Sequence, residues 1–186
     1  RDYDWRSARH RVDLDSAEAI GKRAGERAVR RVNPGAVKSG TLPVLFDPRI
    51  GGSLVGHLMG AIGGSMIARK TSFLLDALGE ALFDSAISVI DDPLRPRGLG
   101  SRAFDGEGLP TARTAVIDKG VLTGWMMESA AARQLGLKPT GHASRGGSGA
   151  PGTSPSNLHL EGGALSVAEL ISDIDYGVYI HELSGQ

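Results

Sequence analysis

Residues 43–70 read PVLFDPRIGGSLVGHLMGAIGGSMIARK and predict a short strand followed by a long helix. Pro43 to Phe46 form a short apolar run, which is typical of a buried strand. Asp47-Pro48 marks the turn into the helix. From Ile50 to Ala68 no residue is charged, so we expect this helix to be buried inside the protein.

The predicted helix has two distinct faces. Large apolar residues recur every four positions on one face, and glycines recur every four positions on another face about 200° away. The apolar row is Ile50, Leu54, Leu58, Ile62 and Met66, and the glycine row is Gly52, Gly56, Gly60 and Gly64. We expect the apolar row to fill a core and the glycine row to let a neighbouring backbone approach closely. Each glycine costs up to about 1 kcal/mol relative to Ala, so packing has to stabilise the helix.

The length of this uncharged segment, 19 residues, would allow it to cross a membrane. Six of the residues are glycines, two are serines and one is His57, and this composition makes insertion unfavourable. The sequence therefore predicts a buried helix and no membrane partner.

The flanking sequence predicts helices and strands that do not alternate regularly. Ser16 can cap a helix that runs to about Val32 and is ended by Asn33-Pro34-Gly35. Residues 114–126 predict a β-hairpin with Lys119-Gly120 as its two-residue turn. Further expected elements are strands at 86–90, 157–160 and 178–183 and helices at 128–135 and 167–174. This mixture favours an α+β fold with antiparallel strands over a doubly wound parallel sheet.

Composition and charge exclude several functional classes. The 186-residue chain has no Cys and equal numbers of acidic and basic residues, 21 of each. The lack of Cys excludes a disulfide framework and fits a cytoplasmic location, and the zero formal charge argues against a polyanion as the main partner. Residues 1–40 alone have a basic excess, with ten Lys or Arg against six Asp or Glu. The basic residues of the predicted helix are Lys22, Arg23, Arg27, Arg30 and Arg31, which we interpret as a solvated face rather than a nucleic-acid contact.

Two histidines are candidate metal ligands. His57 has three candidate roles, as a metal ligand, a general base or a core imidazole, and the core role is favoured because a catalytic zinc needs three protein ligands. His181-Glu182 begins like a zinc helix, but Gln186 stands where a second His is needed, and the alternating pattern there predicts a strand.

Two other motifs have simpler interpretations than a binding site. Gly64 to Thr71 would match a phosphate loop, except that Arg69 replaces a required Gly. Asp105 and Glu107 place two carboxylates in a glycine-containing loop, as candidate contacts to substrate, an ion, an Arg or solvent. Two oxygen ligands are too few to name a metal, and no pattern for a hydrolytic triad is present.

Five longer blocks resemble the TldD/PmbA family, which is named for a candidate modulator of DNA gyrase and understood as a family of peptidases. The blocks are FDPRIGGSLVGH (46–57), ARKTSFLLDALG (68–79), DDPLRPRGLGSRAFDGEG (91–108), ARQLGLKPTGHASR (132–145) and SPSNLHLEGG (154–163). They are most similar to the PmbA branch, also called TldE. The resemblance covers roughly the whole chain.

The resemblance implies that the family's metal site is degenerate in this chain. In the TldD branch the helix carries His-Glu-x-x-x-His, and the resemblance puts Gly52 at the first His, Ser53 at the Glu and His57 at the second His. It further implies a Cys ligand, which has no counterpart among these residues. We therefore expect no catalytic residue and no bound metal here, with zinc on a partner subunit.

The function implied by the resemblance is that of a non-catalytic subunit, inactive without a TldD-type homologue, in a zinc metallopeptidase complex that trims unfolded peptides. A homodimer remains an alternative assembly. Two other functions also remain open, a stand-alone peptide-binding adaptor that uses strand addition and a modulator of DNA gyrase. The chain begins at Arg1 without an initiator Met, so we expect a fragment. Residues 1–40 would link from an N-terminal domain, and residues 41–186 would form part of a C-terminal peptidase-like α+β domain.

Overall fold

The computed structural model describes residues 1–33 and 35–183, which divide into two compact units. Unit 1 contains Arg1–Thr41 together with Arg97–Leu99, and unit 2 contains the rest of the described chain. The predicted role of residues 1–40 as a link from a preceding domain stays a prediction. No helix in the described ranges is long and apolar enough to cross a membrane.

Unit 1 is built on helix α1 (Ala17–Arg30), preceded by a short 3-10 turn, η1 (Arg11–Asp13). The hydroxyl of Ser16 accepts a hydrogen bond from the Ala19 backbone N–H at 3.1 Å, which confirms the predicted helix start. None of the α1 residues is buried. Its arginines pair with acidic residues of the same unit, Arg23 with Asp4 and Asp15, Arg27 with Asp4, and Arg31 with Asp2. Much of the predicted basic face is therefore neutralised within the unit.

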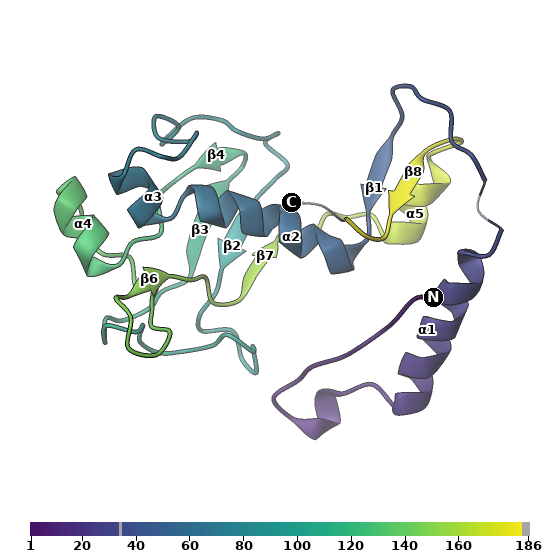
Figure 1. The fold of residues 1–186 in the computed structure, drawn as a ribbon, viewed down its shortest axis with the longest axis horizontal. Helices are drawn as coiled ribbons and strands as arrows, with labels where there is room; N and C mark the ends of the chain where they lie inside the picture. The colour runs from purple at the N-terminus through teal and green to yellow at the C-terminus, as the bar shows by residue number, and fades with distance from the viewer. Residues whose placement is uncertain (34, 184–186) are drawn as a thin grey trace. The chain divides into compact units, whose positions relative to one another are not determined.

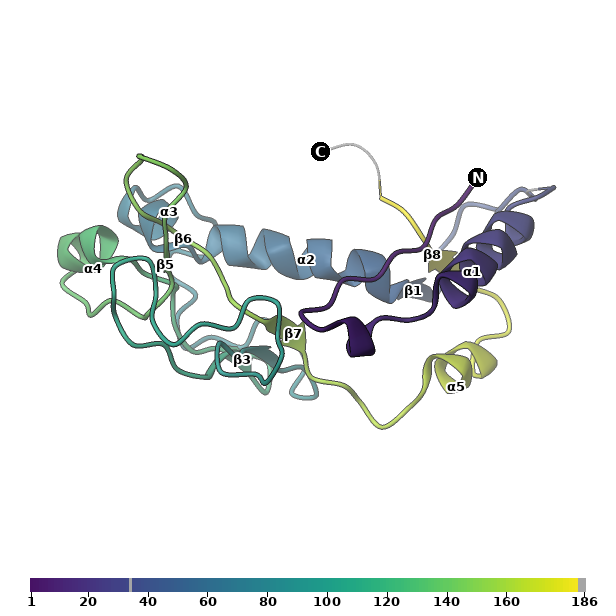
Figure 2. The same cartoon turned by 90° about the horizontal axis from the view of Figure 1, so that it is seen from below.

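Unit 2 contains an antiparallel sheet with one helix across its face (Figures 1 and 2), which confirms the predicted α+β class. The strand order is β4 (Val121–Leu122), β3 (Thr114–Asp118), β2 (Val89–Asp91) and β7 (Leu158–Leu160). Helix α2 (Pro48–Ala61) contributes Met59 to the core, where Ile62, Ile117 and Leu122 are wholly buried.

A second, two-stranded sheet departs from the antiparallel expectation. Strand β1 (Val44–Phe46) pairs in parallel with β8 (Val178–Ile180), with Leu45 opposite Tyr179. These strands can pair in parallel because a long stretch of chain connects them, as a parallel pair requires. Helix α5 (Val167–Ser172) precedes β8 and begins with a capping box between Ser166 and Glu169. Strand β8 ends at Ile180, three residues before the predicted end at Leu183.

The prediction of one long helix over residues 50–68 is wrong, because the segment forms two helices. Helix α2 ends at Ala61, Gly63 is extended, and α3 (Gly64–Ala68) begins after it. The Gly64 N–H donates to the Met126 carbonyl at 2.7 Å, and a Cβ on Gly64 would lie 2.7 Å from Met127 Cγ. The close approach predicted for the glycine row therefore occurs at Gly64, and the tertiary contacts it permits turn the chain.

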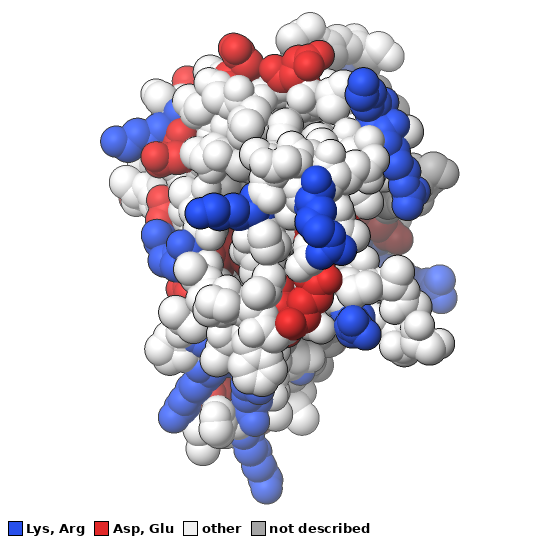
Figure 3. Space-filling model, turned by 90° about the vertical axis from the view of Figure 1, so that its left-hand side faces the viewer, with Lys and Arg blue, Asp and Glu red and all other residues white. Residues whose placement is uncertain are grey.

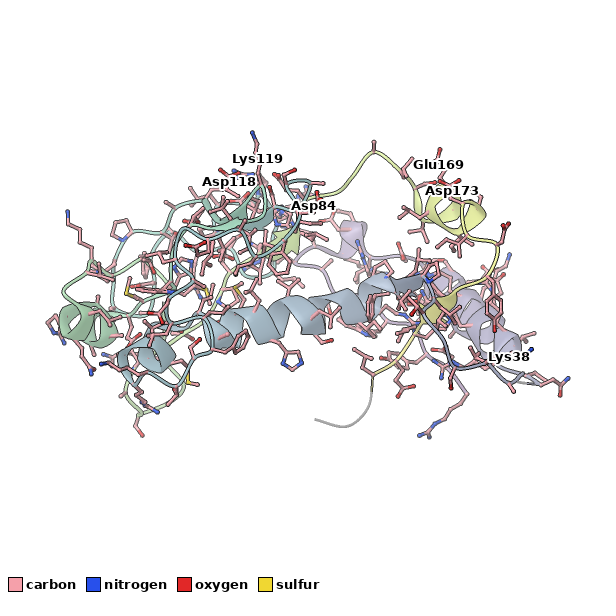
Figure 4. All side chains as sticks on the ribbon, turned by 90° about the horizontal axis from the view of Figure 1, so that it is seen from above. Lys38, Asp84, Asp118, Lys119, Glu169 and Asp173 are labelled. Atoms are coloured by element: carbon pink, nitrogen blue, oxygen red, sulfur yellow. The ribbon has the colours of Figure 1, made fainter. Side chains whose placement is uncertain are left out.

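The β3–β4 hairpin confirms the predicted turn at Lys119-Gly120, where both residues have positive φ, 47° and 84°. Figure 4 shows Lys119 pointing outward from this turn. The second arm is shorter than predicted and ends at Leu122. Helix α4 (Ser129–Leu135) lies between its N-cap Glu128 and Gly136, which has a φ of 68°. The glycine- and serine-rich segment 140–155 contains a further short hairpin, β5 (Ala143–Ser144) with β6 (Gly152–Thr153).

Candidate functional site

Helix α2 begins at a buried carboxylate. Asp47 is 6% exposed and accepts hydrogen bonds from the backbone N–H of Arg49 at 2.9 Å and from its guanidinium at 3.0 Å. His181 Nδ1, just beyond β8, lies 3.3 Å from the same carboxylate. Burial would raise the pKa of Asp47, but the hydrogen bonds from Arg49 and His181 outweigh it and lower the pKa to about 2. An ionised Asp47 therefore fixes both the start of α2 and the end of β8.

The exposed face of α2 carries the three positions that the resemblance aligns with the family's zinc motif. Gly52, Ser53 and His57 are all exposed, and the Ser53 hydroxyl donates to the Ile50 carbonyl at 2.7 Å. A Cβ built at Gly52, Gly56 or Gly60 would meet no neighbouring atom of the described chain within 4 Å. The prediction that the glycine row packs closely is thus wrong for the α2 glycines, whose backbone is uncovered.

His57 is not the core imidazole that the sequence favoured. Val55, Leu58 and Met59 form the face of α2 that packs on the core, and His57 lies outside it. In the described residues the His57 ring makes no hydrogen bond or ion pair. Leu54 of the expected apolar row is likewise 41% exposed. The face that packs on the core therefore includes Leu58 of the predicted row, and Ile62 just beyond the helix is wholly buried, but Leu54 lies outside this face while Val55 and Met59 belong to it.

The donor set on α2 does not fit a zinc ion. Gly52 has no side-chain donor, the Ser53 hydroxyl is bound to its own helix, and His57 alone supplies one imidazole where a catalytic site needs three protein ligands. Across residues 1–33 and 35–183 no group of three His, Cys, Asp or Glu side chains is placed to hold a metal. At its glycines α2 instead presents exposed backbone.

Asp105 and Glu107 are brought together in one loop, where both bind the protein itself. Asp105 is 4% exposed and accepts from the backbone N–H groups of Glu107, Leu109 and Ala143 at 2.9 to 3.1 Å. Burial opposes ionisation, but these hydrogen bonds lower the pKa of Asp105. Glu107 accepts from the Ser129 N–H at 2.9 Å and from its hydroxyl at 2.6 Å. These contacts hold the loop against α4, and the contact of either carboxylate with substrate or an ion stays a prediction.

The other two sequence motifs have structural roles. His181 follows the end of β8 rather than lying within it, and Ser184 to Gln186 of its motif lie outside the described residues. In the Gly64–Thr71 motif, Arg69 is the C-cap of α3, and Lys70 has a φ of 58°. The Thr71 N–H donates to the Met66 carbonyl at 3.0 Å, which closes the helix end.

Sequence reasoning missed a buried polar cluster at the end of β2. The Asp91 carboxylate, 1% exposed, accepts from the Ser156 N–H at 2.7 Å and hydroxyl at 2.9 Å, and lies 3.3 Å from His142 Nε2. Burial raises the pKa of Asp91, but His142 and Ser156 more than offset this, and the net shift is downward. The only sequence signal was an acidic residue directly after an apolar run. The spacing of the three residues carries no pattern.

Charge on the surface does not indicate a polyanion site. Figure 3 shows one face of the molecule with Lys and Arg dispersed among Asp and Glu rather than gathered into one patch. Together with the internal ion pairs of α1, this distribution agrees with the zero formal charge.

The fold and the site define an α+β domain in which a capped, glycine-rich helix crosses an antiparallel sheet. Residues 39–186 match the family described as the PmbA/TldA metallopeptidase C-terminal domain, and the chain belongs to this family. The resemblance to the TldD/PmbA family is thereby confirmed.

Individual relatives agree with this assignment. Metalloprotease PmbA of Escherichia coli O157:H7 is 36% identical over 186 residues, which cover 100% of this chain and 39% of that protein. A candidate modulator of a DNA gyrase from Thermotoga maritima superposes with a TM-score of 0.86 at 36% identity, covering 96% of this chain and 40% of that one. TldE from Thermococcus kodakarensis superposes with a TM-score of 0.85 at 28% identity, covering 94% and 40%. The chain thus spans about two fifths of the length of these relatives.

Proposed function

We propose that this chain is part of a non-catalytic, TldE/PmbA-type subunit of a cytoplasmic zinc metallopeptidase complex. In this proposal a TldD-type homologue holds the zinc and hydrolyses unfolded peptides. The present chain supplies part of the wall against which the peptide lies.

One observation carries the proposal, the intact framework around an α2 face that has no catalytic group. Asp47 caps the helix and the core holds its other side, so the helix is firmly placed. Its exposed face nevertheless carries Gly52 and Ser53 where hydrolysis needs a ligand and a base. A helix that is held in position but has no catalytic side chains can serve as a contact surface for a peptide. Its exposed glycine backbone lets an extended peptide approach closely.

The decisive experiment determines which of the two subunits binds zinc and hydrolyses the peptide. The full-length protein and its TldD-type homologue are purified separately and together, zinc is measured per subunit, and cleavage of an unstructured peptide is followed in all three samples. We expect zinc and cleavage to depend on the homologue, with cleavage increased when both are present. If the full-length protein alone bound one zinc and cleaved the peptide, the proposal would be wrong.

A stand-alone peptide adaptor is the second candidate, and the β1–β8 sheet favours it. Strand β1 pairs with β8 alone in the described chain, which leaves the outer edge of β1 without a strand partner. Such an edge can accept an extended peptide by strand addition. Peptide binding of equal strength with and without the TldD-type homologue would favour the adaptor over the complex.

Gyrase modulation is the third candidate, and the ion pairs of α1 count against direct contact with DNA. Binding to duplex DNA that weakened steeply with rising salt would support it. Absence of such binding by the full-length protein would remove its physical basis.

A further inference from the structure

The hairpin β5–β6 has a firmly held base and a loosely held tip. Residues 145–151, here called the flap, contain three glycines, and all but the half-buried Pro151 are exposed. Gly147 has a φ of 62°. No side chain of the flap makes a hydrogen bond within the described chain, so its position depends on the residues just before and after it.

The base of the hairpin is fastened on both arms by one buried carboxylate. Asp91 lies 3.3 Å from the His142 ring on the incoming arm and accepts two hydrogen bonds from Ser156 on the outgoing arm. The Ser154 N–H donates to the His142 carbonyl at 2.9 Å and joins the arms directly. We call Asp91, His142 and Ser156 the clasp.

Neighbouring charged groups reinforce the clasp. Asp105 accepts from the Ala143 N–H at 3.1 Å, and Arg102 donates to the Ser154 carbonyl at 2.8 Å. The other ring nitrogen of His142 lies 2.8 Å from the Thr140 hydroxyl, which also accepts from the Met127 N–H. Both ring nitrogens of His142 therefore have partners, as a fixed ring orientation requires.

The base of the β5–β6 hairpin lies at the C-terminal end of α2. Thr153 Oγ1 would be 3.3 Å from a Cβ on Gly63, the residue that joins α2 to α3. Figures 2 and 4 show the β5–β6 loop projecting past α3 on the side of α2 that faces away from the sheet. The flap and the exposed glycine face of α2 are thus on the same side of unit 2.

We propose that Asp91 and His142 are positioning residues whose clasp holds the flap beside the C-terminal end of α2, where the flap forms a movable wall for a bound peptide. The clasp itself is independent of any ligand. The role of the flap toward a peptide rests on the proposed function.

Amide hydrogen exchange of the full-length protein tests the clasp. In Asp91→Asn we expect the Ser154 amide, which does not touch residue 91, to exchange about tenfold faster, because a charge-assisted hydrogen bond is lost at the hairpin base. The Thr123 amide, bound to the Val116 carbonyl in the β3–β4 hairpin, should change by less than about twofold. Asp118→Asn makes the same chemical change at an exposed position of β3 and should leave Ser154 unchanged.

Two results would overturn the clasp. If Ser154 and Thr123 accelerated equally, Asp91 would stabilise the whole unit rather than the flap, and if neither changed, the clasp would hold nothing. Should Asp91→Asn fail to fold, Ser156→Ala decides, since it removes one hydroxyl and keeps the backbone N–H. It should accelerate Ser154 by about threefold, and no acceleration would refute the clasp.

Binding of a fluorescent unstructured peptide to the complex with the TldD-type homologue tests whether the flap forms a wall for the peptide. Asp91→Asn should weaken peptide binding several-fold relative to Asp118→Asn. If the affinity for the peptide were unchanged although the Ser154 amide exchanged faster, the flap would not be a wall for the peptide, but the role of the clasp would stand. Failure of the unmodified complex to bind the peptide would instead reject the proposed function.

Discussion

Four residues of the described chain other than glycine have positive φ, namely Asn33, Lys70, Arg97 and Lys119. This conformation strains an ordinary side chain, and Asn or Gly adopts it at lower cost. At Lys119 the strain has a clear origin, because a two-residue turn with both φ values positive is needed to match the twist of β3 and β4. The preferred sequence for such a turn is Asn-Gly.

Lys119→Asn should therefore stabilise the protein. We expect the free energy of unfolding, measured by urea denaturation, to rise by about 0.5 to 1 kcal/mol, because Asn tolerates the left-handed conformation. Lys138→Asn removes the same charge at an exposed position without positive φ and serves as the control. An equal gain in both variants would point to charge rather than turn geometry.

The carboxylate of Asp47 should make unit 2 sensitive to acid. Its folded pKa of about 2 lies below the ordinary value of 3.8, so its stabilisation is complete above pH 4 and is lost as pH falls toward 2. Over this range the wild type should lose about 2 kcal/mol more unfolding free energy than Asp47→Asn, which has no carboxylate to protonate. Urea denaturation at several pH values measures the difference. Parallel loss in the two proteins would contradict it.

Among the elements, those specified by neighbouring residues were predicted well. Ser16 and Gly136 mark the ends of α1 and α4, and Lys119-Gly120 marks the turn between β3 and β4. The break between α2 and α3 was not predicted, because it depends on contacts of Gly64 with residues 126 and 127, which no local pattern reveals. The apolar row at spacing four correctly predicted the burial of Ile62 and the core packing of Leu58, but not the exposure of Leu54 and Met66.

The glycines of α2 allow stability and binding to be separated. Gly56→Ala should raise the unfolding free energy by about 0.5 to 1 kcal/mol, because Ala favours a helix and its methyl group meets open space. If the exposed backbone contacts a peptide or a partner, the same change should weaken that binding. Thermal unfolding and a peptide-binding assay together measure both effects.

Two further variants serve as controls for this prediction. Gly25→Ala, in α1, also meets open space and should stabilise without affecting binding. Gly64→Ala should destabilise by about 1 to 3 kcal/mol, because the methyl group would overlap Met127. A stabilised Gly56→Ala variant with unchanged binding would mean that the glycine face is not a contact surface.

For the molecule as a whole, the sequence predicted the α+β class and the family, whereas long-range pairing came only from the structure. The parallel pairing of β1 with β8 and the meeting of Asp91 with His142 join segments with no shared local pattern. The resemblance places Gly52, Ser53 and His57 on one helix, but their exposure depends on which face of α2 packs on the core. Sequence periodicity alone identified that face only in part, at Leu58 and Ile62.

The two units should respond differently to salt, because they are held by different forces. Unit 1 has no buried residue in α1 and relies on ion pairs that reach Asp2, Asp4 and Asp15, whereas unit 2 has a buried apolar core. The arginines of these pairs remain 24% to 39% exposed, so solvent reaches one side of each pair, and salt weakens the interaction there by shortening the screening length to about 3 Å at about 1 M. Limited proteolysis should therefore cut residues 1–16 several-fold faster at high salt, while the β2–β3 region is cut no faster.

Asp4→Asn should produce the same pattern at low salt, since it removes the shared partner of Arg23 and Arg27. Salt-independent cleavage of residues 1–16 would show that apolar contacts, not ion pairs, hold unit 1 together.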